Sequence, residues 1–113
     1  MDRKTAIEKI KNAAEKHGFV FVQRGNDVQI KDGDNWLKSW VNFTVLDMED
    51  VHWNMKEHTI TERLKVTASV SRMGGDTSVE ELLAAADSIK RAAELVAELE
   101  QTDLEYTINF DEE

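Results

Sequence analysis

The hydrophobic positions of residues 3–17 repeat at the interval of an amphipathic helix. Five residues recur at spacings of three and four and would form one stripe along it: Ile7, Ile10, Ala13, Ala14 and His17. Gly18 comes directly afterwards and is expected to end the helix as its C-terminal cap. The first predicted element is therefore a helix with one face ready to pack on another layer.

Alternation of apolar and polar residues predicts strands through much of residues 19–70. Residues 19–22 and 28–31 flank a turn at residues 24–27 whose glycine and asparagine tolerate positive φ, and together they predict a β-hairpin. Residues 36–46 continue as the next strand of a meander, with inward side chains at Leu37, Val41, Phe43 and Val45. The opposite face of this strand would carry Trp36, Lys38, Trp40 and Asn42.

The register of this alternation changes after residue 46. An acidic turn is expected at residues 47–50, followed by a short strand with Val51, Trp53 and Met55. From Ile60 onward the inward side chains stand at even positions: Leu64, Val66, Ala68 and Val70. The change predicts a turn or bulge at residues 56–59.

The last third of the chain predicts a long helix and one more strand. Overlapping capping boxes begin at Thr77 and Ser78, and a helix is expected over residues 78–101, followed by a strand over residues 104–110. The order α-β-β-β-(β)-β-α-β predicts an α+β fold, a two-layer sandwich with a mainly antiparallel meander sheet and two helices on one face. A single domain spanning residues 1–113 is expected.

The long helix has three faces when its residues are projected at about 100° each. The face expected to pack into the core carries Val79, Leu82, Leu83, Ala86, Ile89, Ala93, Val96 and Ala97. An acidic face carries Glu80, Asp87, Glu94, Glu98 and Gln101. A third face, partly apolar and expected to point outward, carries Ala85, Ala92, Leu95, Leu99, Glu81 and Ser88.

Composition and charge restrict the classes of function. The 113 residues include 14 Lys and Arg, 23 Asp and Glu and no cysteine, which gives a net charge of −9 and excludes thiol chemistry and cysteine metal sites. Residues 74–113 hold 12 acids against Lys90 and Arg91. Such a field repels nucleic acid and attracts basic surfaces. The candidate partner-binding acids are Glu80, Asp87, Glu94 and Glu98, with a merely solvated helix face as the alternative.

Two tryptophans are the second candidate binding feature. Trp36 and Trp40, with Lys38 between them, are expected on the sheet face opposite the helices, where exposed indoles would be costly. Tryptophan is enriched at the centres of protein interfaces, so all three are candidate partner-binding residues. Two alternatives are that other parts of the protein or a dimer mate cover the rings, or that they stack on nucleic acid bases.

No residue pattern predicts catalysis, a metal or a cofactor. His52 and His58 lie near acids, yet a spacing with five residues between two histidines is no standard metal motif. Residues 32–35 lack the later ligands of a calcium loop. No Lys-Ser or Lys-Thr pair follows Gly74 and Gly75, as a nucleotide-binding loop would require.

In size, charge and order of elements the chain resembles bacterial immunity proteins, secretion chaperones and phage antidefence proteins such as anti-CRISPRs. The main hypothesis is a non-enzymatic inhibitor that occupies the basic, nucleic-acid-binding surface of a larger partner protein. One rival is a structural or assembly protein or chaperone that forms homo-oligomers, such as a homodimer, through the Trp-bearing sheet face. Another is a small metal- or ligand-dependent enzyme using His52 and His58.

The expected location is the cytoplasm. The chain shows no signal-peptide pattern and no apolar run near the roughly 20 residues that span a bilayer, so direct contact with a membrane is not expected. Direct contact with nucleic acid is not expected either, because of the acidic charge.

Overall fold

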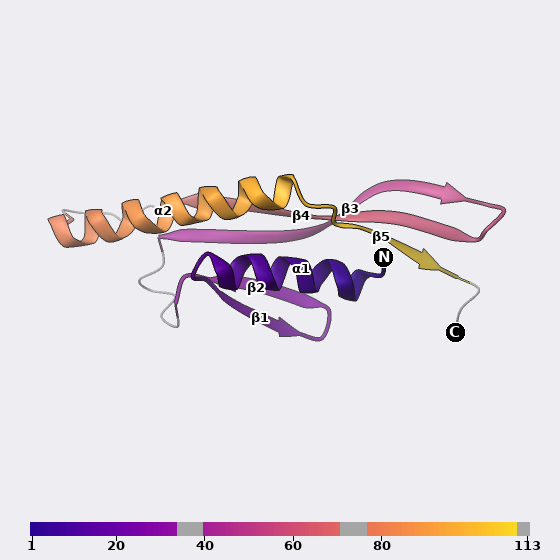
Figure 1. The fold of residues 1–113 in the computed structure, drawn as a ribbon, viewed down its shortest axis with the longest axis horizontal. Coiled ribbons are helices and arrows are strands. Elements are labelled where there is room, and N and C mark those ends of the chain that lie inside the picture. The colour runs from indigo at the N-terminus through magenta and orange to yellow at the C-terminus, as the bar shows by residue number, and fades with distance from the viewer. Residues whose placement is uncertain (34–39, 71–76, 111–113) are drawn as a thin grey trace.

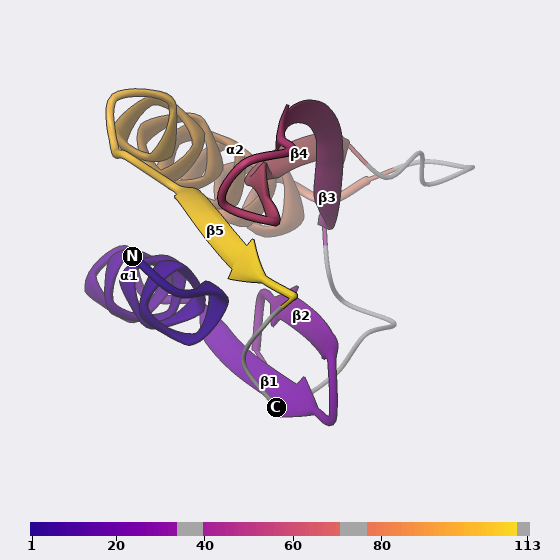
Figure 2. The same ribbon diagram turned by 90° about the vertical axis from the view of Figure 1, so that its right-hand side faces the viewer.

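The computed structural model describes residues 1–33, 40–70 and 77–110, and its elements follow the predicted order. They are α1 (Arg3–Lys16), β1 (Val20–Arg24), β2 (Asp27–Lys31), β3 (Val41–Asn54), β4 (Thr59–Val70), α2 (Val79–Glu100) and β5 (Glu105–Asn109) (Figure 1). The predicted α+β class is confirmed, and both helices lie on the same side of the strands (Figure 2).

The strands form two antiparallel sheets within the described part of the chain. One contains β1 and β2, and the other has the order β3-β4-β5. The β1–β2 hairpin turns at Gly25, which has the positive φ of +60° expected there. The predicted continuous meander is therefore divided after β2, because β3 pairs with β4 and not with β2.

The β3–β4 hairpin is longer than the sequence pattern predicts. Pairing runs from Val41 opposite Val70 to Asn54 opposite Thr59, with a register shift between Met48 and His52. The acidic turn expected at residues 47–50 is wrong, since this backbone belongs to β3. A register irregularity within a strand changes which side chains face inward without ending the strand. The turn itself lies at residues 55–58, close to the predicted position.

Both helix boundaries follow from local capping. Asp2 accepts the backbone N–H of Thr5 at 2.8 Å and begins α1, and Gly18 follows its end with φ of +82°. Ser78 accepts the N–H of Glu81 at 3.1 Å and donates its hydroxyl proton to the Glu81 carboxylate at 3.2 Å. The second of the two predicted capping boxes therefore begins α2.

One core joins α1, both sheets and α2. Its centre includes Ile10, Leu64, Leu95 and Tyr106, all almost fully buried. As predicted, Val41 points into this core, and Phe43 and Val45 pack against it.

A polar cluster joins α1, β3, β4 and β5 at one side of the core. The buried Tyr106 hydroxyl lies 2.9 Å from Asp47 and 2.5 Å from Glu62, to which it is a shared donor. Arg3 donates to Asp47 at 3.1 Å, and this bond holds the pKa of Asp47 below its usual range. Burial raises the pKa of Tyr106, and the two carboxylates raise it further, so the phenol remains a neutral donor at neutral pH.

The molecule is elongated, measuring 60 × 24 × 24 Å with a radius of gyration of 16.8 Å. A compact chain of this length would have a radius near 13 Å. Figure 1 shows one cause, because the N-terminal half of α2 projects beyond the ends of β3 and β4. In the described part of the chain, neither helix has the length and apolar character needed to cross a membrane.

Candidate protein-binding surface

The helix α2 packs with the face that the sequence pattern assigned to solvent. Its buried residues are Ala85, Ser88, Ala92, Leu95 and Leu99. The face predicted to be the core is instead open: Val79 is 71% exposed, Leu82 56%, Leu83 66% and Ile89 39%. The predicted orientation of this helix is therefore wrong.

Polar contacts made by Arg91 and Ser88 account for the orientation. Arg91 donates to Asp32 at 3.1 Å and to the carbonyl oxygens of His17 and Gly18 at 3.2 and 3.3 Å, and its guanidinium lies 4.7 Å from the Phe19 ring centre. The Ser88 hydroxyl also donates to Asp32. These partly buried bonds would be lost if α2 turned, and an unpaired Asp32 carboxylate at this site would be costly.

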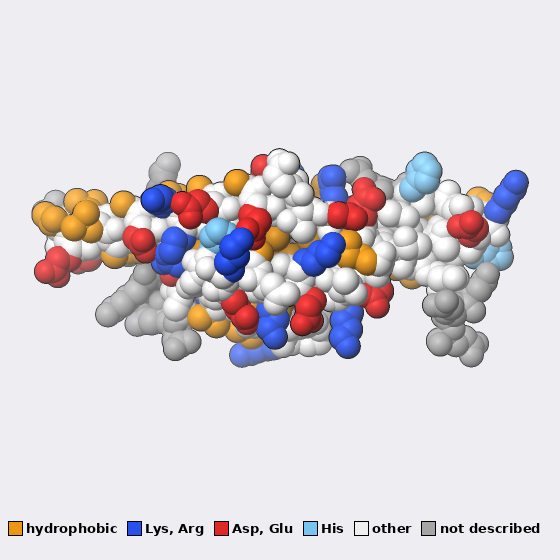
Figure 3. All heavy atoms as spheres, in the orientation of Figure 1, with side chains coloured by type: hydrophobic (Ala, Val, Ile, Leu, Met, Phe, Trp, Pro, Cys, Tyr) orange, Lys and Arg blue, Asp and Glu red, His pale blue; other side chains and the backbone are white. Residues whose placement is uncertain are grey.

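We call the apolar side of this helix that lies outside the core the α2 outer face, in which all residues are exposed except the half-buried Val96: Val79, Leu82, Leu83, Ala86, Ile89, Ala93, Val96 and Ala97. Figure 3 shows hydrophobic side chains gathered at the end of the molecule where α2 begins. A helix with apolar residues on most of its circumference is normally covered on all those sides. In the described part of the chain, α1 and the sheet cover only one of them.

A groove of about 370 Å³ runs between α2 and the adjoining ends of β3 and β4. Ten residues line it: Val41, Ala68, Ser69, Val70, Ile89, Ala92, Ala93, Val96, Ala97 and Glu100. Ala68 and Val70 occupy the inward register predicted for them, yet both are exposed. The helix packs on β4 nearer its middle and leaves this end as an open apolar wall.

The four candidate acids do not form one free stripe. Glu98 faces α1, where its carboxylate accepts Lys16 Nζ at 2.6 Å and lies 3.6 Å from His17 Nε2. The bond from Lys16 lowers the pKa of Glu98. Asp87 accepts Arg91 Nε at 2.9 Å, whereas Glu80 and Glu94 are exposed and form no ion pair with other described residues.

Trp40 is the one described residue of the predicted binding set Trp36, Lys38 and Trp40. Trp40 is half-buried and packs against the core, so its predicted place on the opposite face is wrong. It precedes the first residue of β3, and strand alternation does not extend to it. Trp36 and Lys38 lie outside the described residues.

An exposed aromatic pair at the β3–β4 hairpin was not anticipated. Trp53 is 62% exposed and stacks on Phe110, with ring centres 6.1 Å apart and planes 15° apart. Met55 is also exposed beside it in the sequence. The sequence places Trp53 and Met55 on the same predicted strand, but Phe110, on which Trp53 stacks, lies more than 50 residues away along the chain.

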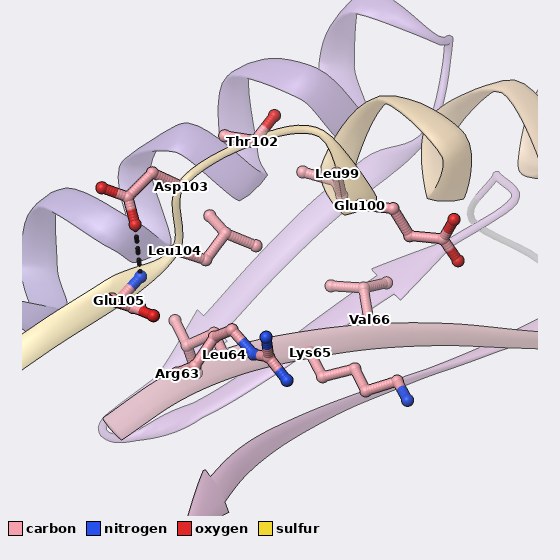
Figure 4. Close-up of a pocket in the computed structure, with 10 residues that line it drawn as sticks. All are labelled: Arg63, Leu64, Lys65, Val66, Leu99, Glu100, Thr102, Asp103, Leu104 and Glu105. Atoms are coloured by element: carbon pink, nitrogen blue, oxygen red, sulfur yellow. Dashed lines mark hydrogen bonds between the residues drawn. The ribbon is translucent and has the colours of Figure 1, made fainter. Parts of the chain in front are cut away.

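A second hollow, also of about 370 Å³, lies between β4 and the segment after α2 (Figure 4). Its lining mixes Arg63 and Lys65 with the acids Glu100, Asp103 and Glu105. Figure 4 shows the side chains of Lys65 and Glu100 both extending to the right, from β4 and from the end of α2, while Asp103 lies at the left, so these charges do not converge on one point.

The described residues contain no candidate metal site. No group of three His, Asp or Glu side chains among them is placed to hold a metal ion, and His52 and His58 are both exposed. Comparison with known proteins adds no relative, since no family model matches the chain and neither a curated protein nor a solved structure gives a significant match.

Proposed function

We propose that the protein is a non-enzymatic protein-binding module whose binding surface is the α2 outer face with its adjoining groove. The observation that supports this most is the exposure of Val79, Leu82, Leu83 and Ile89 along one side of a single helix. Soluble monomers rarely leave large contiguous apolar patches uncovered, and such patches mark interaction sites. The proposal is closest to the hypothesis of an assembly protein or chaperone, with binding through α2 in place of the Trp-bearing sheet face.

The energetic incentive for covering this face is large. Fully burying one such side chain contributes about 1.5 to 3 kcal/mol, so covering the exposed parts of these four would contribute about 3 to 7 kcal/mol. The free energy that holds a whole domain together is only about 5 to 15 kcal/mol. A partner on this face would therefore make a contribution comparable to folding itself.

A photo-crosslinking residue tests the surface directly in cells that express the full chain. Leu83→p-benzoylphenylalanine should capture a protein, whereas the same residue at the exposed Arg24 of the β1–β2 hairpin should not. Capture at position 83 alone supports the function. Equal capture at both positions, or none at position 83, contradicts it.

A second candidate function is inhibition of a larger protein with a basic, nucleic-acid-binding surface, exercised in the cytoplasm. It is favoured by the acidic charge of residues 74–113 and by the exposed Glu80 and Glu94 beside the α2 outer face. These two acids carry the hypothesis best, because Glu98 and Asp87 are engaged within the chain. Glu80→Lys with Glu94→Lys should then slow association with the basic partner and reduce its salt dependence. Association unchanged by both reversals contradicts this function.

A further inference from the structure

The α2 outer face contains the spacing of a coiled-coil seam. Six of its residues alternate at intervals of three and four, and we call them the α2 seam: Val79, Leu82, Ala86, Ile89, Ala93 and Val96. This is the pattern by which one helix packs along another. A neighbouring side of α2, about 110° around the helix axis, has a comparable series from Ala85 to Leu99, which is already buried within the chain. The helix therefore carries two seams, of which one is used internally.

We propose that the α2 seam binds the α2 seam of a second copy, antiparallel, to form a two-fold symmetric dimer. The inference rests on the proposed protein-binding function and names the partner of that surface.

Size complementarity within the seam supports a second copy. In an antiparallel pair centred between Ala86 and Ile89, Leu82 faces Ala93 of the second copy and Ile89 faces Ala86. The outermost layers pair Val79 with Val96. Leu82 and Ile89, the two largest side chains of the seam, thus each meet an alanine, which is how facing core positions interdigitate. A seam that binds a foreign helix would have no need to match its own reversed order.

A parallel pair would pack less well. It would set Leu82 against Leu82 and Ala86 against Ala86, so crowded layers would alternate with layers too small to fill the space. Unfilled space in an apolar interface loses contacts and destabilises it. The antiparallel arrangement also satisfies the rule that a two-fold interface uses the same patch on both copies.

The groove lies where α2 of the second copy would pack in this arrangement. Leu82 of one copy would lie beside Ala93 of the other, and Ala93 lines the groove whose far wall is Val41, Ala68 and Val70. The projecting half of each α2 would therefore cover the open wall of the other copy. The projecting half of α2 and the groove are exposed in the single chain (Figures 1 and 3), and the dimer would cover both.

Charge does not prevent the pairing. The seam itself contains no charged residue, and Glu80, Asp87 and Glu94 each directly follow a seam residue, which turns them about 100° away from it. Two copies of charge −9 still repel one another at long range. Salt screens that repulsion, so the dimer should become tighter as ionic strength rises. Steering by acids towards a basic partner would have the opposite salt dependence.

The α2 seam alone offers only a small interface. Residues 79–96 form about 27 Å of helix, and a helix with its side chains is about 10 to 12 Å wide, so the seam presents of the order of 300 Å² per copy. A symmetric pair of seams would bury about 600 Å², so the groove walls must be covered as well to approach the lower limit of about 1,200 Å² for specific interfaces. A reversible dimer at micromolar concentrations is the corresponding expectation.

Sedimentation velocity of the full chain across the micromolar range is the first test. The wild type should shift towards twice the monomer mass of 12.9 kDa as concentration and salt rise. Ala86→Glu and Ile89→Lys should each remain monomeric, and an equimolar mixture of the two should recover a dimer because these positions face each other. Arg24→Gln lowers the net charge by one, as Ala86→Glu does, but lies exposed on the β1–β2 hairpin, so it should dimerise like the wild type, and circular dichroism should show all variants folded.

Disulfide trapping provides a second test that does not depend on the charged variants. The chain has no cysteine of its own, so Leu82→Cys and Ala93→Cys introduce single thiols. Mixed together, they should oxidise to a crosslinked heterodimer, because only opposed positions bring Cα atoms within about 7 Å. Leu82→Cys alone should stay uncrosslinked, since its two copies would stand 11 residues, or about 16 Å, apart along the axis.

The failures of the two proposals can be told apart. A wild type that stays monomeric, or Leu82→Cys that crosslinks to itself, overturns the antiparallel dimer. If the chain is monomeric while the photo-crosslinker at position 83 captures a different protein, the binding function stands and the second copy is the wrong occupant. No capture at position 83 and no dimer overturns both.

Discussion

Replacing Leu95 with alanine should destabilise the protein far more than replacing Leu83. Leu95 is 0% exposed at the centre of the core, whereas Leu83 is 66% exposed on the α2 outer face. Removing three buried carbons loses about 2.4 kcal/mol of transfer free energy, and the cavity left behind adds to this. Leu95→Ala should therefore lower the free energy of unfolding by about 3 to 4 kcal/mol. Leu83→Ala removes carbons that are mostly in water already and should cost under about 1 kcal/mol.

Urea unfolding followed by circular dichroism measures both values. With a slope of about 1.5 kcal/mol per molar urea, the midpoint of Leu95→Ala should fall by about 2 to 2.7 M and that of Leu83→Ala by less than about 0.7 M. Both variants are compared with wild type at one low protein concentration, because dimerisation would add a concentration-dependent contribution to stability.

The reverse order of midpoints would refute the orientation of α2. It would mean that the face with Leu83 packs on the sheet, as helical periodicity alone suggested. Equal losses would mean that both faces of the helix are buried within one chain, and the α2 outer face would then not be a surface at all.

Three further predictions concern other contacts. Arg91→Met should lower stability by about 2 to 3 kcal/mol in urea unfolding because it leaves the Asp32 carboxylate without its cationic partner, while Lys90→Met should change it by less than about 0.5 kcal/mol; similar effects would contradict the anchoring role. The folded-state pKa of Asp47 lies below the unfolded value of about 3.9. The ionised carboxylate therefore contributes fully to the free energy of unfolding above that value, and this contribution is lost as pH falls through the folded pKa. Asp47→Asn should therefore flatten the loss of stability as pH falls below about 4, and an unchanged slope would show that this carboxylate is not coupled to folding. In the double variant Trp36→Phe with Trp53→Phe, the remaining Trp40 emission should be blue-shifted and weakly quenched by acrylamide, and strong quenching would place Trp40 in solvent.

Periodicity in α2 located its apolar faces but could not choose between them. Both series repeat at helical spacing, and the one with more large aliphatic side chains was the natural choice for the core. The choice depends instead on Ser88 and Arg91, whose common partner Asp32 lies 56 and 59 residues away along the chain. Contacts of this kind are set by the tertiary structure and leave no periodic signal.

Alternation of apolar and polar residues predicted side-chain direction correctly for residues that lie inside a strand. It placed Val41 and Val66 in the core, and it failed at Trp40, one residue before β3 begins. For Val70 it identified the correct face but not the exposure, because alternation says which way a side chain points and not whether anything covers it. Neither candidate surface feature, the open side of α2 nor the Trp53–Phe110 stack, could be located without the fold.

The place of β5 in the sheet has a consequence for the synthesis of the protein. This strand pairs with β4, its Thr107 N–H donates to the Met1 carbonyl oxygen at 3.1 Å, and its Tyr106 fills the centre of the core. Figure 2 shows it between α1 and β4. Every other element is translated before β5, yet α1 and β4 meet across it. While the ribosome is still translating α2, the earlier elements lack the strand that joins them. Their apolar surfaces therefore stay exposed to solvent in the nascent chain. The β3–β4 hairpin can form early from local pairing, but closure of the core is a late step that follows translation of residue 109.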